Sequence, residues 1–139
     1  LQGFAFIPKM QSTVLVCRIG KSNELFVCQF TEIDKVVFTS ADTSLTVDAD
    51  KIEALKGGNF SILINSESMT IQAGQATIKT TTGGLTLTKG SSGLKKTLND
   101  LLAAIQKLTV TTSLGPSGPP INMADFIKVQ KELSNYLEG

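Results

Sequence analysis

The sequence contains no histidine and no tryptophan, and only two of its 139 residues are cysteines. Without histidine, the chain lacks the commonest general base at neutral pH, the usual partner of serine and cysteine nucleophiles, and the commonest metal ligand. No nucleophile stands at a recognisable spacing from a base. We therefore expect no enzymatic activity, no catalytic residues, no bound metal and no cofactor.

Strong charge of one sign and long hydrophobic runs are also missing. The 13 basic and 12 acidic side chains leave a net charge of +1, whereas nucleic-acid-binding domains usually carry a strongly basic face. No segment approaches the roughly 20 consecutive apolar residues that cross a bilayer. We expect neither a nucleic-acid partner nor a membrane-spanning segment.

What the sequence has instead is a short apolar repeat in its middle third. Pairs of apolar residues separated by one position recur between Phe60 and Lys89, and their starts lie 7, 7 and 9 residues apart. The residues between the pairs are nearly all Ser, Thr, Gly, Gln or Asn. This spacing predicts short strands with one apolar side, joined by polar corners at glycines. The pairs are Ile62 and Ile64, Met69 and Ile71, Ala76 and Ile78, and Leu85 and Leu87.

Two apolar side chains per strand are too few to build a core within one chain. We therefore expect identical chains to wind together, so that these rows meet on a shared axis and the strands satisfy each other's backbone groups. Leu45 and Val47 fit an early step of the repeat, and residues 52–55 fit either a strand or a short helical turn. A flexible Ser/Thr-rich linker is the alternative, which the regular spacing disfavours. The predicted axis residues are Ile62, Ile64, Met69, Ile71, Ile78, Leu85 and Leu87.

The first 40 residues alternate like strands and contain a predicted hairpin. With Ser22-Asn23 as a two-residue turn, opposed residues have numbers that sum to 45, so Cys17 faces Cys28. A cross-strand disulfide is one interpretation of this pair. Two small buried hydrophobes are the favoured one, so we expect reduced thiols.

The chain changes character at Gly90, after which leucine and isoleucine recur at steps of four and three. This spacing predicts an amphipathic helix with a seam about two heptads long and Ser92 as its N-cap. The seam fits either a coiled coil between chains or packing against a second helix. That second helix is predicted from Asn122, after a stiff Pro/Gly-rich connector at residues 114–120. The seam residues are Leu94, Leu98, Leu101, Ile105 and Leu108, and the apolar stripe of the second helix is Phe126, Val129, Leu133, Tyr136 and Leu137.

Asp48 and Asp50 have the spacing of two ligands in an oxygen-rich cation loop. The remaining ligands and the glycine of a calcium-binding loop are missing. Solvated acidic residues in a turn are therefore the better interpretation.

Several segments resemble a known family. Ile7–Val16, with the sequence IPKMQSTVLV, resembles the barrel strand that begins with P-x-x-G-S-x-V-x-V in the oligonucleotide/oligosaccharide-binding (OB) domain of phage baseplate spike proteins. Residues 26–38 resemble the next strands of that domain, and residues 45–87 resemble the intertwined β-helix that follows it. Residues 94–105 and 115–122 are similar to the C-termini of phage and prophage tail proteins.

This resemblance implies a mainly β fold in three segments. Residues 1–40 would form an OB-like β-barrel that is incomplete at its N-terminus, and residues 41–90 would form the β-helix rungs of a trimeric stalk. Residues 91–139 would form a C-terminal helical hairpin with the Pro/Gly connector. Because the sequence begins with Leu1 rather than Met, we expect a processed product or part of a longer protein.

The function implied by the resemblance is structural. In that family three chains form the central spike of the tail baseplate, beneath the tail hub, and the virion uses it to breach the host envelope. The implied partners are two further copies of the chain, the tail hub or other baseplate proteins, and the host cell envelope, after assembly in the host cytoplasm. The family's lysozyme-like domain and the paired histidines of its iron-binding tip are missing here, so no tip metal is carried over. The alternative function is an OB-type module that binds glycan or protein as an adhesin or docking element.

Overall fold

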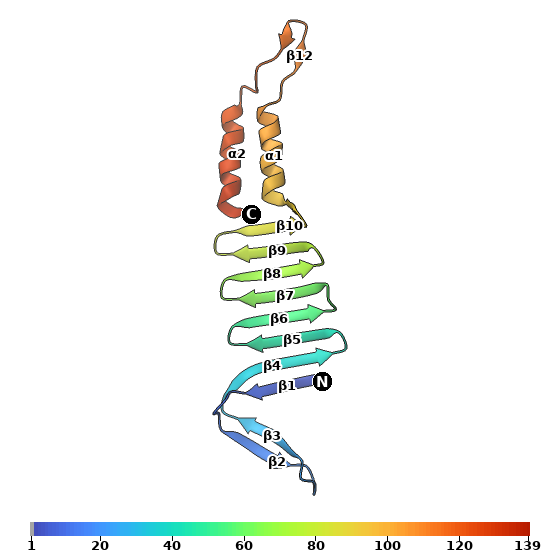
Figure 1. Ribbon diagram of the computed structural model, residues 1–139. Helices are drawn as coiled ribbons and strands as arrows, with labels where there is room; N and C mark the ends of the chain where they lie inside the picture. Colours follow the sequence, from blue (N-terminus) through green and yellow to red (C-terminus); the bar gives the residue numbers. More distant parts are fainter. Residues whose placement is uncertain (1) are drawn as a thin grey trace. The chain divides into compact units, whose positions relative to one another are not determined.

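The computed structural model describes residues 2–139, which form a mainly β protein with two helices near the C-terminus (Figure 1). The chain divides into a first unit that ends at Ser66 and a second unit, Glu67–Gly139. The predicted segment boundaries near residues 40 and 90 fall inside these units, at Ser40, which ends a strand, and at Gly90, which lies in a turn.

The first unit is a meander of antiparallel strands. Its main sheet has the order β1-β4-β5-β6-β7, and β2 and β3 form a separate two-stranded sheet. Short turns connect β4 to β7 in sequence, so each of these strands pairs with the strand before it. The strands are β1 (Gly3–Pro8), β2 (Val14–Arg18), β3 (Leu25–Phe30), β4 (Ile33–Ser40), β5 (Thr43–Asp48), β6 (Lys51–Lys56) and β7 (Phe60–Asn65).

The strands at the N-terminus do not close into the predicted OB-like barrel. β1 pairs with β4 from Gly3 opposite Thr39 to Pro8 opposite Ile33. Within the described residues, β2 and β3 pair only with each other, so no hydrogen-bonded ladder joins their sheet to the main sheet. The prediction of a barrel is therefore wrong, because both sheets are open.

The turn of the β2–β3 hairpin also differs from the prediction. It lies at Gly20, which has a φ of +57°, instead of at Ser22-Asn23. Ser22 N–H donates to Ile19 O at 3.1 Å, and Ile19 N–H donates to Glu24 O at 3.0 Å. The Ser22 hydroxyl also donates to Ile19 O and accepts from Glu24 N–H. Glycine adopts positive φ without strain, and a serine side chain that bonds nearby backbone stabilises a turn, which explains this choice.

The moved turn and a β-bulge together take the cysteines out of the predicted register. Cys17 lies on the turn side of the bulge and faces Phe26 because the turn has moved, and the bulge between Leu15 and Val16 leaves Cys28 with no directly opposed residue in the ladder. Cys28 is then the diagonal neighbour of Cys17. The two cysteines are joined by a disulfide with their Cα atoms 6.2 Å apart. The expectation of reduced thiols is therefore wrong.

The short strands predicted from the apolar repeat are present, and each is five or six residues long. Residues 52–55, which fitted either a strand or a helical turn, lie in β6. Glycines lie at some of the corners, where Gly57 and Gly74 both have a φ of +58°, but the corner between β5 and β6 is Ala49-Asp50. A residue with a Cβ rarely adopts this conformation, so these two turns favour glycine.

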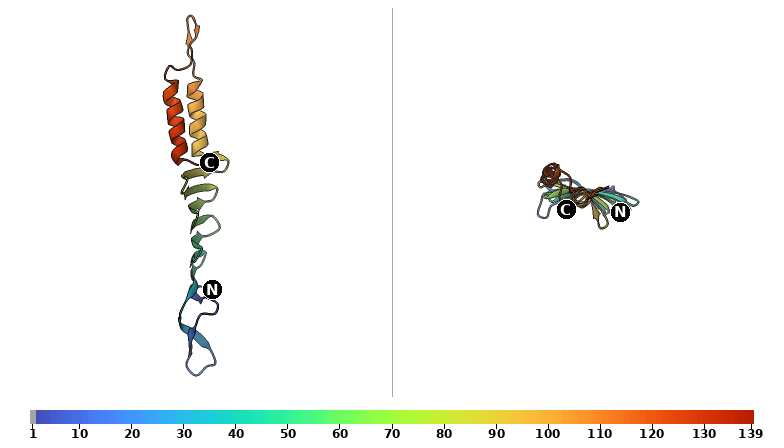
Figure 2. Two further views of the ribbon diagram at one scale, coloured as in Figure 1. Left: turned by 90° about the vertical axis from the view of Figure 1, so that its left-hand side faces the viewer. Right: turned by 90° about the horizontal axis from the view of Figure 1, so that it is seen from above.

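The second unit combines a sheet of order β8-β9-β10-β11 with a helical hairpin. Figures 1 and 2 show α1 and α2 side by side and antiparallel, with the β12–β13 hairpin at their far end from β10. The elements are β8 (Ser68–Ala73), β9 (Ala76–Thr81), β10 (Leu85–Lys89), β11 (Ser92–Gly93), α1 (Leu94–Gln106), β12 (Thr111–Thr112), β13 (Gly115–Pro116) and α2 (Met123–Tyr136).

Both predicted helices are present, with different capping. Ser92 was the predicted N-cap of α1, but it lies in β11 and pairs with Lys89 of β10. Gly93 is the N-cap instead, without a side-chain capping bond. α2 begins directly after Asn122, as predicted, although the Asn122 side chain makes no capping bond. The connector at residues 114–120 contains β13 of a small hairpin, in which Thr111 faces Pro116.

The C-terminal residues return to the sheet of the second unit. Leu137 forms a parallel bridge with Leu85, and Glu138 N–H donates to Leu85 O at 2.9 Å. Leu133 and Leu137 are 7% and 2% exposed, and they are the only buried hydrophobic residues within residues 2–139. The core of a single chain is therefore confined to the junction between α2 and its C-terminal extension.

Candidate assembly surfaces

One face of the main sheet in the first unit is apolar across all five strands. Directly opposed residues of antiparallel strands project to the same side of a sheet, so the register assigns each side chain to a face. We call this surface the first apolar face. One row is Phe6, Val36, Val47, Ile52 and Ile64, and the other is Phe4, Phe38, Leu45, Ala54 and Ile62.

The aromatic side chains gather at the β1 end of this face. The ring centroid of Phe4 lies 5.6 Å from that of Phe6 and 6.1 Å from that of Phe38. The Phe6 ring lies 6.1 Å from the ring of Phe30 in β3. A shallow hollow of about 300 Å³, lined in part by Phe4, Phe38 and Leu45, opens beside this group. These rings remain available for further packing, because Phe4 is 64% exposed.

Sequence reasoning anticipated only part of the first apolar face. Ile62 and Ile64 were predicted axis residues, and the register places both on it. Phe4, Phe6 and Phe38 were missed because their segment was assigned to a barrel. The signal that could have found them is the period-two alternation that identified Ile62 and Ile64.

The opposite face of the same sheet carries most of the polar groups. Lys35 faces Asp48, and Thr46 faces Glu53. Lys51 Nζ lies 2.8 Å from Glu53 Oε2, and this ion pair raises the pKa of Lys51. Val37, Leu55 and Leu63 also lie on it, so this face is mixed, and the first apolar face is the better surface for a partner.

The second unit has an equivalent apolar surface, which we call the second apolar face. Ile78 of β9 faces both Ile71 of β8 and Leu87 of β10. Met69 and Leu85 face Thr80 from either side. The five predicted axis residues of this unit therefore share one face. The other face is polar and consists of Ser68, Thr70, Gln72, Thr77, Lys79, Thr81, Thr86 and Thr88.

The amount of exposed surface is too large for a compact single chain. The accessible area is 10558 Å² for a mass of 14.8 kDa. A folded monomer of this mass is expected to expose about 7,000 Å². The excess of about 3,600 Å² falls within the roughly 2,000–5,000 Å² of obligate protein interfaces.

The predicted helical seam divides between two environments. Leu98 and Ile105 are half-buried, as is the neighbouring Leu102. Leu94 and Leu101, seven residues apart, stay exposed, and Leu101 is 54% exposed. Leu108 lies beyond the C-terminal end of α1 and is also exposed. The seam therefore contributes both to packing within the second unit and to a free apolar strip.

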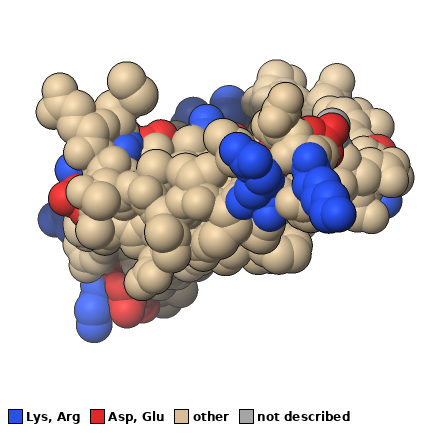
Figure 3. Space-filling view, turned by 90° about the horizontal axis from the view of Figure 1, so that it is seen from below, with Lys and Arg blue, Asp and Glu red and all other residues tan. Residues whose placement is uncertain are grey.

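Charge does not mark an alternative binding surface on the visible face of Figure 3. Uncharged residues cover most of this view from below, and the basic and acidic side chains lie in small separate groups. A continuous basic patch, which would attract a nucleic acid, is not seen on it.

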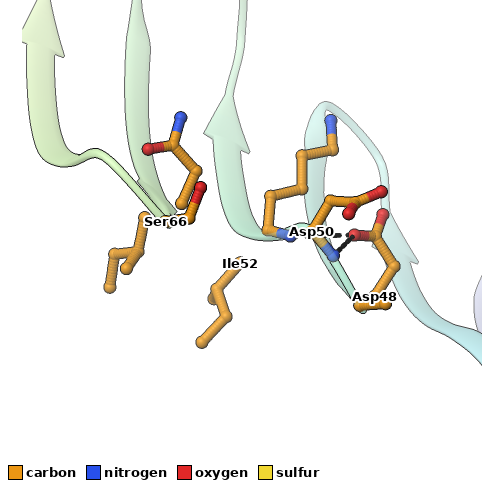
Figure 4. Close-up of a pocket in the computed structure, with 8 residues that line it drawn as sticks. Asp48, Asp50, Ile52 and Ser66 are labelled. Atoms are coloured by element: carbon orange, nitrogen blue, oxygen red, sulfur yellow. Dashed lines mark hydrogen bonds between the residues drawn. The ribbon is translucent and has the colours of Figure 1, made fainter.

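The acidic turn between β5 and β6 is structural. Asp48 Oδ1 accepts hydrogen bonds of 2.9 Å from both Asp50 N–H and Lys51 N–H, drawn as dashed lines in Figure 4. These two bonds lower the pKa of Asp48. The turn borders a shallow pocket of about 390 Å³ that also includes Ile52 and Ser66.

This arrangement does not support a cation site. One Asp48 oxygen is already used by the backbone of its own turn. Among the residues that the structure describes, no three His, Cys, Asp or Glu side chains are grouped so that they could hold a metal ion. The interpretation as turn acids is therefore retained.

Comparison with models of protein families, with curated proteins and with solved structures finds no match for this chain. The functional argument therefore rests on the residues and geometry of the chain and on the sequence resemblance described above.

Proposed function

We propose that the protein is a non-enzymatic, homotrimeric structural component of a phage tail baseplate, in which three chains form a central spike beneath the tail hub. Its mechanism is mechanical rigidity. The two apolar faces of each chain would pack against those of the other chains, and the polar faces would meet water. Three chains would thereby form the intertwined β-helix implied by the resemblance.

The observation that carries the proposal is the pair of uncovered apolar faces. Burial of each 1,000 Å² of apolar surface contributes about 25 kcal/mol. This exceeds the cost of about 4–15 kcal/mol for the lost translational and rotational freedom of an associating chain. The surplus must also offset the ordering of side chains and the desolvation of polar groups at the interface.

Identical chains are suitable partners because each offers matching rows at a constant spacing. Closed cyclic symmetry brings the same rows of every copy to one axis, and it leaves no free apolar surface at the end of an assembly. The number three and the phage setting come from the resemblance of residues 7–16, 26–38 and 45–87 to spike proteins. The proposed location is the virion, with the tail hub, other baseplate proteins and the host envelope as partners.

Analytical ultracentrifugation of the full chain tests the assembly. We expect a mass three times that of the 14.8 kDa chain, stable upon dilution. A stable monomer at all concentrations would contradict the proposal and would favour the glycan- or protein-binding module. The phage setting has a separate test, in which antibodies against the chain should label the tail tip of virions in electron micrographs.

A further inference from the structure

The exposed surface of α1 divides into a charged ridge and an uncharged strip. The ridge consists of Lys96, Asp100 and Lys107, and Lys96 forms an ion pair with Asp100 one turn later. The other exposed residues recur at steps of three, four, three and four along the helix and its last turn. We call them the outer strip, and they are Leu94, Thr97, Leu101, Ala104 and Leu108.

The outer strip follows one side of α1 over two heptads. Alternating steps of three and four average about 3.5 residues, which is close to the 3.6 residues of a helical turn. Leu108 lies just beyond α1, but Lys107 N–H donates to Ala104 O at 3.2 Å and Leu108 N–H donates to Ile105 O at 3.0 Å. These bonds continue the last turn as far as Leu108, so the strip is about 21 Å long.

The outer strip offers packing instead of hydrogen bonds. Its Leu94, Leu101 and Leu108 side chains are 36%, 54% and 59% exposed. Thr97 has the only polar side chain of the strip, and its hydroxyl donates to Gly93 O at 2.9 Å. Ala104 is small enough for two helices to approach closely. Layers of leucine therefore alternate with layers of small side chains, and no layer requires a polar partner.

The helix that carries the outer strip is already held in place within its own chain. Gly93, the N-cap of α1, pairs with Thr88 of β10, and α2 lies beside α1 (Figure 1). Leu98, Leu102 and Ile105 are half-buried on the side that packs within the second unit. A helix of 13 residues is marginal on its own in water. Because this one is folded before it meets a partner, association costs less conformational entropy.

We propose that the outer strips of three copies pack against one another as a short parallel coiled coil on the axis of the trimer. In a coiled coil, the residues that face the partner helices recur at steps of three and four and are mostly apolar. Cyclic symmetry keeps equivalent helices parallel, so each layer of the strip meets the same layer of the other copies. This inference rests on the proposed trimer, and it adds a helical interface to the two apolar faces of the sheets.

A further copy of the chain fits the outer strip better than a different protein does. The strip has neither a charge nor a free hydroxyl by which a foreign partner would be selected. Identical copies in register bring leucine to leucine and small residue to small residue. The strip also begins soon after the second apolar face, because only β11 separates β10, which contains Leu87, from α1. The same copies can therefore cover both surfaces.

Interchain disulfides in the full chain test the parallel packing. Thr97→Cys and Ala104→Cys each place one thiol on the outer strip, in a residue of similar size. After mild oxidation with copper phenanthroline, both variants should give linked pairs of chains on a denaturing gel without reductant. The two positions are seven residues, or about 10.5 Å, apart along the helix. Only parallel helices bring both of them within disulfide distance of their equivalents.

Lys96→Cys and Lys107→Cys are the matched controls on the charged ridge, and both should remain single chains. The wild type should also remain single, because its Cys17–Cys28 disulfide lies within one chain. Equal linking on the ridge and on the strip would overturn the proposal. A link at only one of the two strip positions would overturn it as well, since parallel helices bring both positions together.

A charge on the outer strip provides a second measurement. Ala104→Glu should raise the dissociation constant of the trimer by about tenfold or more, because three carboxylates would then lie close together. Its helical circular dichroism should not change, since glutamate is a good helix former. Lys96→Glu introduces the same side chain on the ridge and should leave the dissociation constant nearly unchanged. Equal increases in both variants would count against the coiled coil.

The mass in solution separates this inference from the proposed spike. A trimer that forms no links in Thr97→Cys and Ala104→Cys would overturn the coiled coil and leave a trimer held by the two apolar faces. A monomer at every concentration would contradict the coiled coil and the spike together.

Discussion

The hydroxyl of Thr81 donates a hydrogen bond of 2.8 Å to Glu138 Oε2, across 57 positions of sequence. This contact ties the C-terminal residues to the corner between β9 and β10. The corner itself is built from Gly83 and Gly84, and a Cβ on Gly84 would lie 2.6 Å from the carbonyl oxygen of Tyr136. The two glycines therefore make room for the C-terminal extension of α2.

Substitution Gly84→Ala should displace this extension. The added Cβ would collide with backbone, and Gly84 has a φ of +155°, which residues with a Cβ rarely adopt. We expect a loss of about 1–3 kcal/mol in the free energy of unfolding, measured by urea denaturation. Amide exchange at Glu138 should accelerate. Gly58→Ala is the control, since nothing lies within 4 Å of its Cβ position, and equal losses in both variants would contradict the prediction.

Substitution Ile71→Asp should abolish assembly. Ile71 lies in the middle of the second apolar face, opposite Ile78, and an unpaired carboxylate buried between chains costs several kcal/mol. Ultracentrifugation should then report a monomer at concentrations where the wild type is a trimer. Thr70→Asp is the matched control, because Thr70 lies on the polar face opposite Lys79. An Ile71→Asp variant that still sediments as a trimer would show that this face is not on the axis.

The strands and their apolar faces could be predicted because both follow from a period of two. Ile71 and Ile78 have polar neighbours on both sides in the sequence, and alternation assigns a residue to a face even when the pairing partner is unknown. The faces of the first unit were underestimated for a different reason. The segment with Phe4 was also expected to alternate as a strand, but it was assigned to an OB-like barrel.

The features that were missed depend on single turns and on tertiary context. Gly20 and Ser22 both suit a turn, and choosing between them moved the hairpin register and separated Cys17 from the position opposite Cys28. Ser92 has a side chain that suits an N-cap, but in the structure it lies in β11 and pairs with Lys89 of β10. The exposure of Leu114 depends on where the connector lies relative to α1 and α2, which no local pattern encodes.

Substitution Leu101→Asp should weaken association while leaving the helical hairpin folded. Leu101 is exposed on α1 and makes the free strip with Leu94, so a charge there meets water within one chain. We expect unchanged helical circular dichroism and a higher dissociation constant of the trimer. Leu98→Asp is the contrasting variant, because Leu98 is half-buried, and it should lose helical signal. Loss of helix in both variants would contradict the separation of the seam into inner and outer residues.

The turn at Asp48 should make stability depend on acid pH. Hydrogen bonds from Asp50 N–H and Lys51 N–H hold the folded-state pKa of Asp48 below its ordinary value. Their contribution is therefore fully present above the unfolded pKa and is lost as the pH falls through the lower folded pKa. Asp48→Asn cannot titrate, so its urea midpoint should fall less steeply than that of the wild type between neutral pH and about pH 3. Asp50→Asn, which leaves both bonds to Asp48 in place, is the control. Parallel pH profiles for the wild type and Asp48→Asn would show that the turn contributes nothing to acid sensitivity, and a carbon NMR titration of the Asp48 carboxyl would then locate its pKa directly.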